Sequence, residues 1–137
     1  MRTSILLLNL VLLTTTASAT EELIVGSWCE SGPANDKCTM VETFKSDGSV
    51  WAKGVWDDHG IGYDSSGNWK FNKGELCLNF SQQKYFNAST KEPVEVGNFP
   101  PFCLKIESLD SKELKFVNPH TREIQSMYRF VSSNEKV

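Results

Sequence analysis

The stretch CTMVETFKSDGSVWAKGVW, residues 38–56, decides the fold, because it has the pattern of two strands joined by a tight turn. On each side of the turn the apolar residues recur with a period near two, which is the spacing of a strand with one buried face. The turn is Ser46-Asp47-Gly48-Ser49, and residues of these types favour tight hairpins. We therefore predict strands at residues 38–45 and 50–56.

The same pattern continues in both directions along the chain. After residue 22, no window of roughly 11 residues keeps the i, i+3, i+4, i+7 spacing of a helix, so the predicted class is all-β. Two further tight turns, at residues 73–75 and 110–113, have similar turn chemistry. The eight predicted strands are residues 24–30, 38–45, 50–56, 68–72, 76–83, 102–109, 114–118 and 124–131.

Long connections alternate with these tight turns. They span residues 31–37, 57–67, 84–101 and 119–123, and all five prolines lie in or beside them, where no sheet hydrogen bond is needed. In an up-and-down meander every second connection lies at the same end. We therefore predict an eight-stranded antiparallel up-and-down barrel with tight turns at a closed base and long loops at an open mouth, and without exposed edge strands.

Residues 1–19 have the character of a signal peptide. Arg2 precedes an apolar run at residues 5–13, and Ala17-Ser18-Ala19 is a cleavage motif of small residues. The expected product is a single domain, residues 20–137, in a secreted or periplasmic protein. Removal of Arg2 shifts its formal net charge from −3 to −4. An acidic chain without a Lys/Arg cluster is not expected to bind nucleic acid, and no later apolar run is long enough for a membrane span.

Two short motifs at the ends of this domain are similar to those of a known family. Gly26-Ser27-Trp28 forms a G-x-W in the first predicted strand, and Arg129 lies near the end of the last. Together with the eight-strand meander, they resemble the small lipocalin-like domain proteins of the calycin superfamily. The resemblance implies that Gly26, Trp28 and Arg129 form the base of the barrel. There Arg129 would lie across the Trp28 ring, a cation–π contact worth about 0.5–2 kcal/mol.

Four cysteines behind a signal peptide indicate disulfides, with three possible pairings. Cys29 and Cys38 flank the first long connection, whereas Cys77 and Cys103 lie on neighbouring predicted strands and face outward. We predict the pairs Cys29–Cys38 and Cys77–Cys103, each stabilising the fold by roughly 3 kcal/mol in the chain-entropy model. The chain has no C-x-x-C motif and its two His are far from Cys in sequence, so no metal site and no cofactor are expected.

The predicted inward positions are rich in aromatic residues, which favours a filled barrel or a narrow pocket near the mouth. Glu42 also falls on this face, where a carboxylate must be paired, directed at a ligand or moved outside by a bulge. Trp56 and Trp69 flank the 57–67 connection and are therefore expected at the rim. The candidate ligand-binding residues are Trp56, Trp69, Tyr128, Glu42 and Ser126.

Two functions from different classes remain open. The first is binding of a small apolar or amphipathic ligand at the mouth, and a cavity below about 300 Å³ would exclude it. The alternative is a filled barrel that acts through its long loops as a protein-interaction or inhibitor module, with Phe86, Phe99 and Phe102 as the suspected surface. An enzyme is the least favoured class, because the chain has no Ser-His-Asp arrangement, H-E-x-x-H motif or phosphate-binding loop.

Overall fold

The computed structural model describes residues 19–30, 32 and 38–130. A short helix precedes eight strands, each of which pairs antiparallel with the next, and the last strand returns to the first. The prediction of a closed, antiparallel, up-and-down barrel is therefore confirmed. The elements are α1 (Ala19–Ile24), β1 (Gly26–Cys29), β2 (Met40–Phe44), β3 (Ser49–Trp56), β4 (Ile61–Asn72), β5 (Glu75–Asn87), β6 (Phe102–Leu109), β7 (Glu113–Val117) and β8 (Ile124–Arg129).

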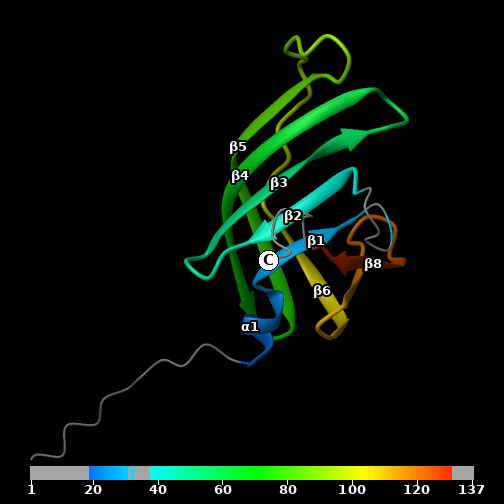
Figure 1. Ribbon diagram of the computed structural model, residues 1–137. Coiled ribbons are helices and arrows are strands. Elements are labelled where there is room, and N and C mark those ends of the chain that lie inside the picture. The colour runs from blue at the N-terminus through cyan, green and yellow to red at the C-terminus, as the bar shows by residue number, and fades with distance from the viewer. Residues whose placement is uncertain (1–18, 31, 33–37, 131–137) are drawn as a thin grey trace, which may run out of the picture.

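The β4–β5 hairpin is longer than predicted and rises beyond the rest of the barrel (Figure 1). The long loop expected at residues 57–67 is wrong, because β3 and β4 are separated only by residues 57–60. Gly62 and Gly67, which suggested a loop, lie within β4 at close approaches between strands. A Cβ at Gly62 would overlap the ring of Phe86, and a Cβ at Gly67 would overlap the backbone of Asn79.

The base of the barrel is covered by a helix that the sequence pattern did not predict. Residues 19–24 form α1, so the first strand begins at Gly26 instead of residue 24. The side chain of Ile24 is fully buried, and its carbonyl accepts a 2.8 Å hydrogen bond from the Trp28 indole. Figure 1 shows α1 at the same end as the β4–β5 and β6–β7 turns. Among the described residues, no helix is long and apolar enough to cross a membrane.

Arg129 lies across the Trp28 ring, with the guanidinium carbon 3.9 Å from the ring centroid, as the resemblance implies. The same guanidinium donates hydrogen bonds to the carbonyls of Val25 and Leu23, where the chain leaves α1. Gly26 has a φ of 127°, and a Cβ there would overlap the Arg129 guanidinium. Glycine tolerates both this dihedral angle and this contact. Gly26, Trp28 and Arg129 thus form one unit that joins the first and last strands.

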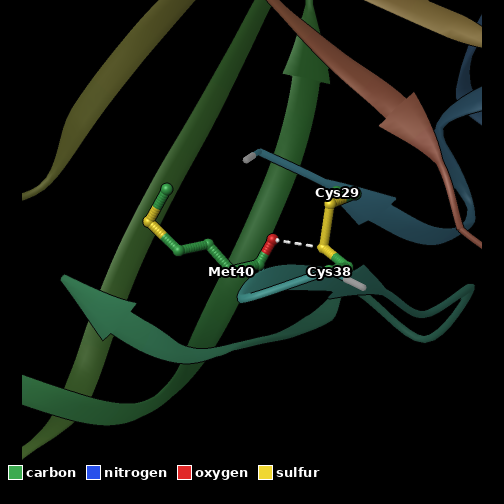
Figure 2. The surroundings of a disulfide bond; sticks show 3 residues. All are labelled: Cys29, Cys38 and Met40. Atoms are coloured by element: carbon green, nitrogen blue, oxygen red, sulfur yellow. Dashed lines mark hydrogen bonds between the residues drawn. A yellow bond between two sulfur atoms is a disulfide. The ribbon is translucent and has the colours of Figure 1, made fainter. Parts of the chain in front are cut away.

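The two disulfides have the predicted pairing, Cys29–Cys38 and Cys77–Cys103. Cys77 and Cys103 are directly opposite each other on β5 and β6. Figure 2 shows the Cys29–Cys38 bond at the end of β1, where the Cys38 sulfur lies 3.0 Å from the Met40 carbonyl oxygen. The Met40 side chain points away from this bond. The first disulfide thus fixes the end of β1 beside the start of β2.

The predicted orientation of the last strand is wrong by one residue. The sequence pattern placed Ile124, Ser126 and Tyr128 on the inner face, yet Ile124 is 59% exposed, whereas Met127 is 1% exposed and belongs to the core. Since alternate residues of a strand share a face, Met127 lies on the same side as Arg129. An inward Arg129 therefore already required an inward Met127.

We expect Arg129→Met to lower the free energy of unfolding by about 2 kcal/mol, because it removes the cation–π contact and charge-assisted hydrogen bonds to backbone carbonyls. The measurement is urea unfolding followed by circular dichroism. Lys70→Met, at an exposed position of β4, is the matched control and should change stability by less than about 0.5 kcal/mol. Equal stabilities of the two variants would contradict the role given to Arg129.

Candidate ligand-binding site

A cavity of about 880 Å³ occupies the mouth half of the barrel. It is well above the volume of about 300 Å³ below which a small-molecule site would be excluded. The closed half is filled by a continuous core, of which Leu104 and Met127 also line the cavity. This core is formed by Ile24, Trp28, Phe44, Val50, Leu76, Leu78, Leu104, Leu114 and Met127. The mouth half is left open to a ligand.

Strand register arranges the cavity wall in rows. One row crosses four strands through directly paired residues, Glu42 to Ala52, Ala52 to Ser65, and Ser65 to Gln83. All four line the cavity, and Glu42, Ala52 and Ser65 are each at most 7% exposed. The next row toward the mouth runs through Met40, Gly54, Tyr63 and Tyr85. A polar row therefore lies at mid-barrel, beneath a row with two tyrosines.

Four aromatic side chains meet above the polar row, and we call Trp56, Tyr63, Tyr85 and Phe99 the aromatic box. The Trp56 ring centroid lies 5.2 Å from that of Tyr63, 5.7 Å from that of Tyr85 and 6.2 Å from that of Phe99. Trp56 and Tyr85 are stacked, and Phe99 meets both edge-on. All four line the cavity. They offer flat apolar surfaces to a ligand at the mouth.

Gln83 holds Phe99 in this box. Its side-chain amide donates to the Phe99 carbonyl at 3.0 Å and accepts from the Phe99 N–H at 2.9 Å. Gln83 also accepts a 2.9 Å hydrogen bond from the Tyr85 hydroxyl. One amide therefore fixes both the 88–101 connection and a ring of the box.

Two carboxyl groups interact directly in the cavity wall, Glu42 on β2 and Glu30 just after β1. Glu42 is 7% exposed, and its Oε2 has no hydrogen-bond partner among the described residues. Burial, the charge of Glu30 and a hydrogen bond to Glu30 raise the pKa of Glu42 well above 4.5, and burial also raises the pKa of Glu30. Burial and these two carboxyls raise the pKa of the nearby Tyr63 phenol. Burial and the neighbouring carboxyl thus both favour the protonated form of Glu42.

The structure brings together only part of the site predicted from sequence. Trp56, Glu42 and Ser126 line the cavity, although the Ser126 hydroxyl donates to Glu113. Tyr128 is absent from the cavity wall and instead pairs with Cys29 and Glu113 in the ladders that join β8 to β1 and β7.

Trp69 also lies outside the cavity wall, because β4 begins at Ile61 and carries Trp69 to the closed end. There its backbone N–H donates to Gly48 in the β2–β3 turn, and its ring meets Phe44 edge-on.

Several residues of the site were missed by the sequence analysis. Tyr63 fell in the expected loop and Tyr85 in the expected 84–101 connection, whereas both lie in strands. The signal that could have found them is the β-branched Ile61 with Tyr63, and Tyr85 with Phe86, because β-branched and aromatic residues are enriched in strands. Glu30 gave no such signal. It lines the cavity because it directly follows Cys29, the last residue of β1.

No convincing metal site is found within the described part of the chain. Glu75, Cys77 and Cys103 are close enough to share an ion, but both sulfurs are joined in the disulfide. Asp57, Asp58 and His59 are exposed in the short β3–β4 turn.

Comparison with known proteins identifies the architecture. No protein-family model matches the chain, and no curated protein matches its sequence. Among solved structures, the crystal structure of a lipocalin-like protein from Bacteroides uniformis is similar, with a TM-score of 0.50 over 79% of this chain and 99% of that one. The fold is lipocalin-like. At 15% identity, the likeness concerns the barrel and not its ligand.

Because Glu42 and Glu30 interact in the wall of this lipocalin-like barrel, we expect its free energy of unfolding to depend on pH. Because folding raises the pKa of Glu42, its contribution is fully present below pH 4.5 and is lost as the pH rises through the higher folded-state value. Glu42→Gln keeps the shape without the charge, so we expect it to exceed wild type by about 1 kcal/mol or more at pH 8 and by little at pH 4.5.

Urea unfolding at both pH values measures this difference. Glu107→Gln, on the exposed face of β6, is the matched control and should follow wild type. If the difference in unfolding free energy between wild type and Glu42→Gln were the same at both pH values, the raised pKa of Glu42 would be contradicted.

Proposed function

We propose that this protein is an extracytoplasmic binding protein for a small molecule with an apolar body, held in the mouth half of the barrel. The observation that carries the proposal is the cavity of about 880 Å³, which has aromatic walls and is continuous with the mouth. Cavities of roughly 300–1,000 Å³ with mostly apolar walls and few polar groups are typical of small-molecule sites. The lipocalin-like fold supports the same function.

The extracytoplasmic part of the proposal rests on the cysteines and on the first residues of the chain. Disulfides persist in oxidising compartments. In this protein Cys29 is bonded to Cys38 and Cys77 is bonded to Cys103. The signal-peptide pattern of residues 1–19 agrees with this location.

The alternative of a protein-interaction module has weaker support. Of the three suspected residues, Phe86 and Phe102 are half-buried, and Phe102 packs against the core. Phe99 is 51% exposed, but its ring meets Trp56 and Tyr85 within the aromatic box. These three side chains therefore do not form one exposed apolar surface.

Filling the cavity should abolish ligand capture. Ala52 lies in the polar row of the cavity wall, whereas its neighbour Lys53 is exposed on the outer face of β3. We expect native mass spectrometry of wild-type protein from its own host to detect a non-covalent small molecule. Ala52→Phe should reduce the bound fraction at least tenfold, because its ring occupies the ligand's space, whereas Lys53→Phe should retain it.

Circular dichroism melts of both variants establish that they are folded. Equal occupancy of folded Ala52→Phe and wild type would contradict binding in this cavity.

The secreted product should begin at Thr20 and contain no free thiol. Intact mass of the purified protein, before and after reduction, measures both properties. We expect the mass of residues 20–137 less four hydrogens, and alkylation only after reduction. A product that retains residues 1–19 or reacts with iodoacetamide without reduction would contradict the extracytoplasmic assignment.

A further inference from the structure

We propose that the ligand is an organic cation, specifically an arylalkylammonium compound, whose ammonium group binds Glu42 and Glu30 while its aromatic ring enters the aromatic box. This inference rests on the proposed function and names the chemical class of its ligand. It is carried by an orphaned carboxylate oxygen, the charge of the cavity wall and the position of the rings.

The orphaned oxygen is Glu42 Oε2, which has no hydrogen-bond partner among the described residues. The Glu42 side chain is nevertheless more than nine-tenths buried, since only 7% of the residue is exposed. A buried polar atom without a partner costs free energy, so its retention in a cavity wall indicates a partner that arrives with the ligand. The Glu42 carboxyl also interacts with Glu30, another acid. A donor is therefore needed at this point, and a cation suits it better than a neutral group.

Charge in the cavity favours a cation. The described lining residues include Glu30 and Glu42 but no Lys or Arg. The other titratable side chains on the wall are Tyr63, Tyr85 and His120, and His120 is exposed at the mouth. An ammonium group beside the two carboxyls brings a positive charge and up to three N–H donors, and any proton that the carboxyls hold is released to solvent.

The rings of Tyr63 and Tyr85 lie at a distance from the Glu42 carboxyl that such a ligand can span. The tyrosines Tyr63 and Tyr85 are two residues closer to the mouth than Ser65 and Gln83, which share a row with Glu42. Two residues of strand correspond to roughly 7 Å. An aryl ring on a two- or three-carbon ammonium chain spans this distance. Electron-rich ring faces also attract a cation that approaches through the mouth.

The size of the cavity favours a ligand of modest length with an aryl group over a simple metal ion. A volume of about 880 Å³ is far larger than an ion needs, and much of the remaining wall is formed by apolar side chains such as Phe80, Phe102, Leu104 and Phe116. Gln83 positions the box, so the ring site is rigid before the ligand arrives.

The test compares three nearly isosteric indoles by isothermal titration calorimetry with the mature, disulfide-bonded protein at pH 7.5. Tryptamine is a cation, tryptophol is neutral and indole-3-propionate is an anion. We expect tryptamine to bind at least tenfold tighter than tryptophol, and indole-3-propionate to bind weakest. Two variants then separate the charge from the rings.

Glu42→Gln should remove the preference for tryptamine over tryptophol while leaving tryptophol affinity within threefold of wild type. Trp56→Leu should weaken tryptamine and tryptophol by a similar factor, since both use the box. Glu107→Gln, on the outer face of β6, should leave all three affinities unchanged.

The possible failures are distinguishable. Equal affinity for tryptamine and tryptophol, or no binding of tryptamine, overturns the inference, whereas a small molecule detected by native mass spectrometry would still support the proposed function. A preference for tryptamine that persists in folded Glu42→Gln also overturns it, because the selectivity would then arise elsewhere.

Discussion

Closure of this barrel depends on Arg129 lying over Trp28. Among the residues that the structure describes, β1 and β8 pair through two residue pairs, Trp28 with Arg129 and Cys29 with Tyr128, so the described ladder at the seam is short. The guanidinium supplements it by stacking on the indole and by binding carbonyls where α1 meets β1. These contacts join the two ends of the described chain and seal the base. The cavity can therefore remain open at the mouth without loss of the closed sheet.

The two halves of the barrel have different roles, since the closed half stabilises the fold and the mouth half contains the proposed binding site. The closed half contains the continuous apolar core, whose packing supplies most of the favourable free energy. The mouth half places the buried Glu42 beside the half-buried Glu30 and leaves one Glu42 oxygen without a partner among the described residues. Such an arrangement costs stability. Buried polar groups without full pairing are concentrated at sites where a protein binds a ligand or catalyses a reaction. The location of the acid pair above a completed core explains how the fold tolerates it.

Sequence alone predicted the architecture better than the site. Alternation, turn chemistry and the spacing of the cysteines were sufficient for the barrel and both disulfides, because these features are local. The extent of β4 was not predictable from pattern, since Gly62 and Gly67 resemble loop residues and are required only by the approach of Phe86 and Asn79. That error placed Trp69 at the wrong end and left Tyr63 out of the site. Pairing of Glu30 with Glu42 depends on three-dimensional register at the end of β1, which no sequence period encodes.

The 88–101 connection has a consequence for solubility. β5 pairs with β6 only from Glu75 to Leu78, so its mouth half would present an open edge on that side. Residues of the connection cover this edge: Val94 donates to the Tyr85 carbonyl, Asn87 donates to that of Glu92, and Phe86 forms a bridge with Pro93. Pro93, Pro100 and Pro101 lack an N–H, so the covering segment is itself a poor template for a further strand. The segment that carries Phe99 to the ligand site thereby also protects the molecule against edge-to-edge aggregation.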